Sequence, residues 1–472
     1  MEISADILHL VHQNMAMQYR IVPYQKDKNQ LYLYAEEGVI EKELREELEI
    51  ILNQEIVLQL LPKAEISRLL AICYLKDQTD SAAQPLSALT AGDDFLDTLI
   101  KEARKLKSSD IHIESFEQKS RVRIRIDGMM IERYQIAKED YPALINKIKI
   151  MANLDIAEKR LPQDGRIHYK LGAETAFDIR VSVLPTLHGE KVVLRLLSNT
   201  STNIDLNILG LSEEDLYHYM QGIQRPNGII LISGPTGSGK TTTLYATLKL
   251  LNKTTRNILT IEDPIEYTLE GINQVQLREN IGLGFASALR TFLRQDPDVI
   301  MVGEIRDPET ANMAIRAALT GHLVLSTIHT NSAWGTVSRL IDMGIPGFLV
   351  ANTLNTTVAQ RLVRLLCPVC KQEEIFNAEA YPKQFNPPFA LNKHYVAKGC
   401  GECYYTGYKG RKAVYEVIPI DAELAFEIKQ ENMYIDELLK NRKIKTLSGN
   451  AFDLFASGQT TLEEIFPLLL NI

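Results

Sequence analysis

The sequence predicts an α/β protein of about three domains, and three observations lead to this fold class. Its 472 residues correspond to about three domains at roughly 150 residues each. From about residue 226 onwards, apolar strands alternate with helical segments, which is the pattern of a sheet covered by helices on both faces. Between about residues 90 and 200, strands of alternating polar and apolar residues are mixed with helices, so an α+β domain is expected there.

Composition and charge exclude several classes of protein. Hydrophobic residues make up 45% of the chain and charged residues 24%, a globular balance rather than a disordered one. The formal net charge of −8 argues against a dedicated binder of duplex DNA, which is usually basic. No apolar run reaches about 18 residues, and the N-terminus lacks the pattern of a signal peptide. We therefore expect a cytosolic protein.

The first 85 residues are expected to form a small α+β domain. Strand-like segments occur at Arg20–Pro23 and Leu31–Tyr34, and an acidic helical segment runs from Glu41 to Leu52. Small and polar residues from Thr79 to Gly92 indicate a linker. Cys73 stands alone in an apolar stretch and is expected to be a core residue.

The middle domain, residues 90–200, carries arginines on one face of its strands. The strand Arg121–Ile126 alternates strictly between arginine and aliphatic residues, which puts the arginines on one side. Two further strands, Ala176–Val183 and Lys191–Leu197, carry Arg180 and Arg195. A solvated sheet surface is the simplest interpretation, and a surface that meets phosphate is the alternative.

The strongest motif is a phosphate-binding loop. Residues 234–241 read GPTGSGKT and match G-x-x-x-x-G-K-[ST] between the apolar strand Gly228–Ser233 and a helix that ends near Leu251. Backbone N–H groups of such a loop point at phosphate oxygens. Lys240 would reach the β and γ phosphates, and Thr241 would ligate Mg²⁺. The expected nucleotide-binding residues are Gly234, Pro235, Thr236, Gly237, Ser238, Gly239, Lys240, Thr241 and Thr242.

Acidic residues follow two further apolar strands of the same domain. Glu266 belongs to the acidic segment Ile261–Tyr267, and Glu304 follows the strand Val299–Gly303. The strand ends beside a phosphate-binding loop face the same crevice. We therefore expect Glu266 and Glu304 to act in the site rather than to be solvated surface residues without a role.

Two histidines, His322 and His329, flank one apolar segment. Seven residue-to-residue steps of extended chain at ~3.3 Å each separate them by roughly 23 Å, so both cannot contact one phosphate. His329, at the carboxyl end, is expected to sense the γ-phosphate, and His322 to pack at the opposite edge or at a subunit contact.

Four of the five cysteines form two Cys-x-x-Cys pairs. They are Cys367, Cys370, Cys400 and Cys403, whose spacing predicts a Cys₄ zinc site within a module at residues 362–415. A redox pair is the alternative, although no thioredoxin-like context accompanies either motif.

Together these motifs resemble the type II secretion and type IV pilus assembly ATPases. The resemblance covers about residues 95 to 465, and besides the segments above it rests on Ser109–Glu114, Arg123–Gly128, Leu161–Arg166, Leu293–Asp307 and Thr406–Arg411.

The resemblance implies a hexameric ring with a PAS-like domain at residues 90–200 and a RecA-like ATPase domain at 206–472. By the same analogy, Glu266 polarises the attacking water and Glu304 positions Mg²⁺ through water. Arg180, Arg195 and, as a third candidate, Arg125 would close onto the nucleotide. The polar segment Ser198–Asp205 would serve as the hinge.

The resemblance also implies partners and a location. The expected cofactors are ATP, Mg²⁺ and Zn²⁺, and the expected partner is a platform protein at the cytoplasmic face of the inner membrane, with residues 1–85 as a short docking domain. The tetracysteine insert favours an assembly motor over a retraction motor. A ring-shaped nucleic-acid translocase is the alternative, disfavoured because no stripe of basic and aromatic residues is present, so no direct nucleic-acid contact is expected. A scaffold without hydrolysis is disfavoured because every catalytic position is filled.

Overall fold

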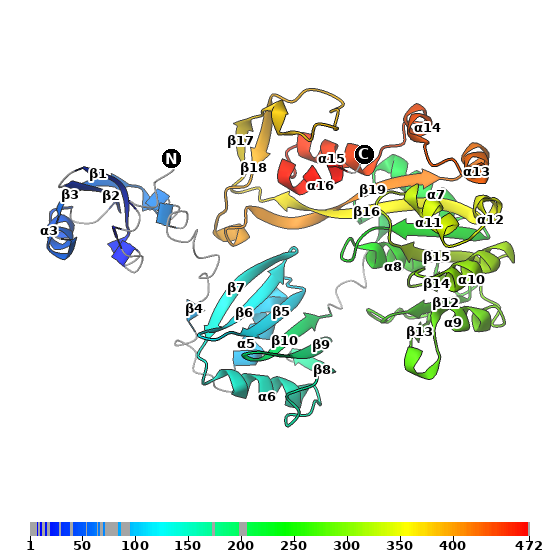
Figure 1. Ribbon diagram of the computed structural model, residues 1–472, viewed down its shortest axis with the longest axis horizontal. Coiled ribbons are helices and arrows are strands. Elements are labelled where there is room, and N and C mark those ends of the chain that lie inside the picture. The colour runs from blue at the N-terminus through cyan, green and yellow to red at the C-terminus, as the bar shows by residue number, and fades with distance from the viewer. Residues whose placement is uncertain are drawn as a thin grey trace. The chain divides into compact units, whose positions relative to one another are not determined.

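The computed structural model divides the chain into two compact units, Met1–Leu197 and Ser198–Ile472. Their elements are labelled in Figure 1. The residues that the structure describes are 7, 10–11, 15–16, 19–27, 30–37, 41–52, 54–63, 65–66, 69–70, 84–85, 95–171, 175–197 and 205–470. Cys73, most of the expected linker and all of the expected hinge except Asp205 lie outside these residues.

A three-stranded sheet forms the first part of the first unit. Its elements are β1 (Ile21–Asp27), β2 (Gln30–Glu36), α3 (Glu41–Leu52) and β3 (Glu55–Leu61). Strand β1 pairs antiparallel with β2, and β3 pairs parallel with β2. A parallel neighbour requires a crossover, which α3 supplies while its Leu44 and Leu48 enter the same core as Leu31 and Leu33. The two strands and the helix expected from the sequence are confirmed.

A seven-stranded sheet forms the second part of this unit, in the order β4-β7-β6-β5-β10-β9-β8. Alternate residues of the six longer strands enter a core with two helices, as Val122 and Ile124 do, while Arg121 and Arg123 lie on the opposite face. The elements are β4 (Gln84–Pro85), α5 (Phe95–Lys105), β5 (Asp110–Ser115), β6 (Ser120–Ile126), β7 (Met129–Ile136), α6 (Tyr141–Met151), β8 (Gln163–Leu171), β9 (Thr175–Thr186) and β10 (Gly189–Leu196).

The polar face of this sheet holds a carboxylate surrounded by cations. Glu114 of β5 accepts hydrogen bonds from Arg123 Nε at 2.8 Å and Arg121 Nε at 3.1 Å, and Lys191 Nζ lies 3.0 Å from it. Burial alone raises the pKa of Glu114, but the bonds from the three cations outweigh burial and hold this pKa at about 2. Glu114 is therefore ionised in the folded protein wherever it would be ionised in the unfolded chain.

We expect Glu114→Gln to destabilise the first unit at pH 7 by about 1–3 kcal/mol, since the variant leaves clustered cations without their acceptor. Because the pKa of Glu114 is lower in the folded protein than in the unfolded chain, ionised Glu114 stabilises the fold fully above pH 4.5, its pKa in the unfolded chain. This stabilisation is lost as the pH falls from 4.5 towards 2, its pKa in the folded protein. Urea unfolding followed at pH 7 and at pH 3.5 measures both free energies. An equal difference between variant and wild type at the two pH values would contradict this assignment.

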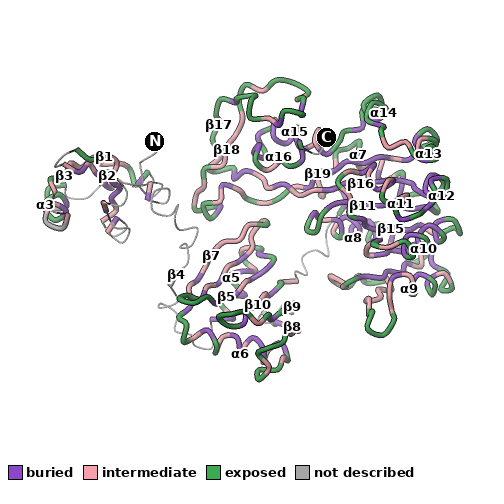
Figure 2. Tube along the Cα trace, viewed as in Figure 1, coloured by how far each residue is buried: buried purple, intermediate pink, exposed green. Residues whose placement is uncertain are grey.

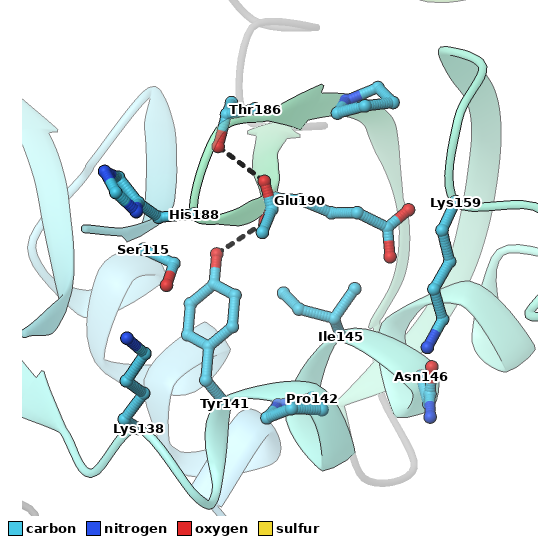
Figure 3. Close-up of a pocket in the computed structure, with 12 residues that line it drawn as sticks. Ser115, Lys138, Tyr141, Pro142, Ile145, Asn146, Lys159, Thr186, His188 and Glu190 are labelled. Carbon is cyan, nitrogen blue, oxygen red and sulfur yellow. Dashed lines mark hydrogen bonds between the residues drawn. The ribbon is translucent and has the colours of Figure 1, made fainter. Parts of the chain in front are cut away.

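A cavity of about 240 Å³ opens between the start of α6 and the turn that joins β9 to β10. In Figure 3, the Tyr141 hydroxyl donates to the main-chain oxygen of Glu190 at 2.6 Å, and Thr186 Oγ1 donates to the carbonyl of Gly189 across the turn. The Glu190 carboxylate forms an ion pair with the fully buried Lys149, at 2.5 Å. None of the expected nucleotide-binding residues lines this cavity.

The second unit is built on another seven-stranded sheet, in the order β13-β12-β14-β15-β11-β16-β19. Every pair is parallel except β16 with β19 at the edge. Its strands are β11 (Gly228–Ser233), β12 (Ile258–Glu262), β13 (Asn273–Gln276), β14 (Val299–Val302), β15 (Leu323–Ile328), β16 (Leu354–Leu366) and β19 (Tyr408–Pro419). Strands β11, β14 and β15 are buried along their whole length (Figure 2).

Helices cover both faces of this sheet, as the alternation of strands and helices predicted. Ile229 and Leu231 of β11 enter a core with one group of helices, and Ile230 and Ile232 enter a core with the other group. The first group comprises α9 (Phe285–Phe292), α10 (Pro308–Leu319), α11 (Gly335–Asp342), α12 (Gly347–Thr353), α13 (Ala422–Lys429), α14 (Asp436–Asn441), α15 (Leu447–Ala456) and α16 (Leu462–Leu470). The second comprises α7 (Glu213–Ile223) and α8 (Lys240–Leu251). No helix in the described part of the chain is long and apolar enough to cross a bilayer.

Candidate functional site

The loop between β11 and α8 has the backbone of a phosphate-binding loop. Gly234, Gly237 and Gly239 have φ angles of +149°, +81° and +89°, in the region that favours glycine. A Cβ atom on Gly234 would lie 2.5 Å from the carbonyl oxygen of Gln360, and one on Gly239 would lie 2.8 Å from the Gln360 amide nitrogen. Gly234 is therefore required by space as well as by conformation, whereas Gly239 is required by its backbone conformation.

Lys240 lies at the mouth of this loop. Its Nζ donates to the carbonyl oxygens of Gly234 at 2.7 Å and Pro235 at 3.0 Å. An ammonium group has three donors, so one N–H is left for a phosphate oxygen. Burial lowers the pKa of Lys240, and the nearby Glu304 carboxylate opposes this shift.

The other residues of the motif surround the same loop. Ser238 Oγ is buried and has no hydrogen-bond partner among the described residues, which suits a donor whose acceptor is a nucleotide oxygen. Pro235, Thr236 and Thr241 are exposed and Thr242 is half-buried. Thr241 lies in the first turn of α8, where its hydroxyl is accessible to a metal ion.

Glu304 and His329 lie together, although 25 positions of sequence separate them. Glu304 follows β14 and His329 follows β15, and the two strands are neighbours. His329 Nε2 lies 3.4 Å from Glu304 Oε2, and Arg306 Nη2 lies 2.5 Å from Glu304 Oε1. The Glu304 side chain is 16% exposed and that of His329 is 50% exposed, so the pair can be reached from solvent at the edge where the phosphate-binding loop lies.

Glu266 is held through a buried tyrosine. Its backbone N–H donates to the Tyr245 hydroxyl at 3.3 Å, and this hydroxyl donates to the buried carboxylate of Glu262 at the end of β12. Glu262 also accepts from Thr260 Oγ1 at 2.6 Å and from Gln274 Nε2 at 3.1 Å. Glu262 is thus a supporting group, whereas Asp263 is exposed and Glu266 is half-buried, so these two acids of the segment are the ones that solvent reaches.

His322 has a structural position. Its Nδ1 lies 2.8 Å from the carbonyl oxygen of Ala317 and 3.2 Å from Thr320 Oγ1 at the end of α10. It precedes β15 while His329 follows it, so the two histidines lie at opposite ends of the strand, as expected.

Four arginines of the first unit lie in a row across its seven-stranded sheet. Cross-strand pairing aligns Arg166, Arg180 and Arg195 on β8, β9 and β10, and continues through Asp110 on β5 to Arg125 on β6. Arg195 Nε donates to Asp110 Oδ1 at 2.9 Å, and Arg125 Nε lies 3.7 Å from Asp110 Oδ2. The Arg195 side chain remains 58% exposed, which leaves part of its guanidinium available to a ligand.

The four predicted cysteines come together. Their sulfur atoms all lie within 4.8 Å of one another, and Cys367–Cys400, Cys370–Cys403 and Cys400–Cys403 are separated by 3.9, 3.7 and 3.8 Å. Tetrahedral zinc with Zn–S bonds of about 2.3 Å separates its sulfurs by about 3.8 Å. A disulfide needs about 2.05 Å, and all four thiols are free. A redox pair needs only two of these thiols, whereas all four come together here, so the cluster fits a tetrahedral zinc site better than the redox alternative.

The insert between the two cysteine pairs is fastened to the C-terminal helices. It emerges between β16 and β19, so the ends of the expected module at 362–415 are strands of the large sheet. Its hairpin consists of β17 (Gln372–Ile375) and β18 (Lys393–Val396). Lys371 Nζ donates to the Gly458 carbonyl at 2.8 Å, and Phe376 meets Phe455 of α15 with ring centres 5.5 Å apart.

We expect the purified protein to contain about one zinc per chain and Cys400→Ser to lose it. The variant should retain nucleotide binding, because the cysteines belong to the insert and not to the phosphate-binding loop. Elemental analysis, limited proteolysis of the β17–β18 hairpin and binding of a fluorescent ADP analogue measure the three quantities. Metal-free protein prepared under reducing conditions, or a variant as resistant to protease as the wild type, would rule out a structural zinc.

Two residues that the sequence analysis missed lie beneath the phosphate-binding loop. Gln360 Oε1 accepts from Thr243 Oγ1 of α8 at 2.9 Å, and an added Cβ on Gly234 would lie 2.9 Å from Arg361 Nη1. Both residues belong to β16, which neighbours β11. No motif that we used contains them, and β16 carries further polar residues such as Asn355 and Thr356, so nothing in the sequence singles this pair out.

A family model described as Type II/IV secretion system protein matches residues 89–467. The chain belongs to this family. It is 48% identical over 383 residues to the type IV pilus assembly ATPase PilB of Myxococcus xanthus, covering 79% of this chain and 66% of the relative. It is also 48% identical over 373 residues to the type II secretion system protein E of Dickeya dadantii, covering 79% and 74%. With its intact phosphate-binding loop, this family member is a P-loop ATPase.

Solved structures agree with the RecA-like fold of this family member. The pilus retraction motor PilT with bound ADP aligns with a TM-score of 0.53 at 26% identity, over 78% of this chain and 95% of that one. The ATPase DotB of Legionella pneumophila aligns with a TM-score of 0.60 over 80% and 95%, at 22% identity, and this likeness concerns the fold alone.

Proposed function

We propose that the chain is a hexameric ATPase that powers assembly of a type II secretion pseudopilus or a type IV pilus. One observation carries this proposal: Lys240, Glu304, His329 and Glu266 all follow the carboxyl ends of strands in one parallel sheet, the edge at which such sheets bind ligands. The relatives named as secretion and pilus assembly proteins support the biological direction.

In this proposal each residue acts at a stated point of ATP hydrolysis. The phosphate-binding loop and Lys240 hold the β and γ phosphates. Glu266 accepts the proton of the attacking water, whose oxygen bonds to the γ-phosphorus while ADP leaves. Thr241 and Glu304 would hold Mg²⁺, which neutralises phosphate charge when bound. His329, beside Glu304, detects whether the γ-phosphate is present.

The arginine row supplies the link between hydrolysis and movement. Arg195, with Arg180 as its cross-strand neighbour, would contact the nucleotide as the ring cycles, and the segment 198–205 would be the hinge. An arginine that meets the nucleotide in one state only couples the two processes.

The proposed partners follow from the relatives' names and the resemblance. The chain would act at the cytoplasmic face of the inner membrane, attached to a platform protein of the secretion or pilus machine. The assembly direction is supported by the Cys₄ cluster and by 48% identity to a relative named as a type IV pilus assembly ATPase.

Hydrolysis and native mass measured on the purified full chain test this proposal. We expect Mg²⁺-dependent ATP turnover by a species about six times the mass of one chain, with stimulation by the cytoplasmic domain of the platform protein. Turnover stimulated by single- or double-stranded nucleic acid instead would favour a translocase.

A further inference from the structure

Arg361 is a half-buried cation whose contacts are carbonyl oxygens. Its Nη2 donates to Asn331 O at 3.0 Å and approaches Thr330 O at 3.5 Å, and its Nη1 donates to Gln360 O at 3.0 Å. No carboxylate of the described residues lies within ion-pair distance of it, although burial disfavours an unpaired charge. We therefore expect Arg361 to have a role that depends on the shape or the charge of its guanidinium group.

The segment that Arg361 contacts, residues 330–333, comes immediately after His329. It is bonded to three different strands. Arg361 binds the carbonyls of Thr330 and Asn331. Ser233, the last residue of β11, donates through Oγ to the carbonyl of Ser332 at 3.2 Å. The buried carboxylate of Glu416 accepts from Ala333 N at 2.8 Å. Four consecutive residues are thus tied to β11, β16 and β19.

The same guanidinium lies against the base of the phosphate-binding loop. A Cβ atom added to Gly234 would lie only 2.9 Å from Arg361 Nη1. The guanidinium therefore packs against Gly234, the first glycine of the loop. Arg361 also lies close enough to Lys240 to oppose its charge, since it contributes to lowering the Lys240 pKa. The planar guanidinium of Arg361 therefore contacts both the phosphate-binding loop and the segment that follows His329. The ammonium group of a lysine is a compact point charge and cannot make both sets of contacts.

We infer that Arg361 is a positioning residue for hydrolysis: it fixes the segment after His329 to the base of the phosphate-binding loop, so that His329 keeps its place beside Glu304 and the γ-phosphate. This inference rests on the proposed role of His329. Arg361 acts through that segment and not as a phosphate ligand.

The test compares Arg361→Ala, Arg361→Lys, His329→Ala and the double variant Arg361→Ala/His329→Ala in the full-length protein. We expect kcat to fall by about 10- to 100-fold in both alanine variants and affinity for a fluorescent ADP analogue to change less than about 3-fold. The double variant should be no slower than His329→Ala, because residues that act as a unit are not additive. Arg361→Lys should stay impaired, since its ammonium cannot bridge the two sides.

Arg442→Ala is the matched control, because Arg442 is an arginine of the same unit bonded to Asp421 and Glu423. Normal kcat in Arg361→Ala together with a slow His329→Ala would overturn this inference alone, as would independent, multiplying losses in the double variant. A loss of ADP affinity above about 10-fold would make Arg361 a phosphate ligand and overturn the positioning role. Normal kcat in His329→Ala would instead contradict the proposed function of that histidine. If Arg361→Ala does not fold, the double variant Arg361→Lys/His329→Ala replaces it. Its kcat then shows whether the losses from the two positions multiply or not.

Discussion

Glu266→Gln is expected to retain ATP binding and to lose turnover by about 100- to 10,000-fold, the range for removal of a general base. Glutamine fills the same space and keeps the backbone N–H bonded to the Tyr245 hydroxyl, but it cannot accept a proton from water. Steady-state kinetics and binding of a non-hydrolysable ATP analogue measure the two effects separately.

The neighbouring acids provide the controls for this prediction. Glu270→Gln, at an exposed position three residues beyond the acidic segment, should leave turnover unchanged. Glu304→Gln should raise the Mg²⁺ concentration needed for activity. If Glu266→Gln turned over normally while Glu304→Gln were inactive, the assignments of base and metal ligand would be reversed.

Arg195→Ala should lower kcat by about 100-fold or more with little change in ATP affinity. An arginine that stabilises charge on the transferring phosphoryl group contributes mainly to the transition state. The bond from Arg195 to Asp110 leaves 58% of the side chain exposed, so the guanidinium can meet a nucleotide without unfolding the sheet. Turnover and ATP affinity of the full chain, measured together, separate the two effects.

Arg133→Ala is the matched variant for Arg195, because Arg133 is an arginine of the same sheet that bonds Glu102 of α5. It should keep normal kcat. Equal losses in both variants would mean that charge on this sheet, and not the position of Arg195, affects turnover.

Much of the second unit could be predicted from the sequence, because its central strands are short apolar runs that end in motifs. The expected bounds of β11 and the expected end of α8 near Leu251 are those of the structure. The grouping of Cys367, Cys370, Cys400 and Cys403 could also be predicted, since two Cys-x-x-Cys pairs in one chain are typical of a metal site with four cysteine ligands.

The edge of the sheet beneath the phosphate-binding loop could not be predicted. Strand β16 buries polar residues such as Asn355, Thr356 and Gln360, so no apolar run marks it, and its neighbour β19 begins with exposed residues. The contact of Arg361 with the segment after His329 is made by residues about 30 positions apart, which spacing alone does not reveal. The support of Glu266 by Tyr245 and Glu262 was missed for the same reason.

Replacing the chromosomal gene of the source organism with one encoding Glu266→Gln, and counting surface filaments or secreted substrate against the wild type at equal protein levels, tests the central claim most directly. The account predicts a loss of filaments or secretion, because an assembly motor that binds ATP without hydrolysing it cannot add subunits. Filaments that persist, or become more numerous as expected when a retraction motor fails, would contradict it.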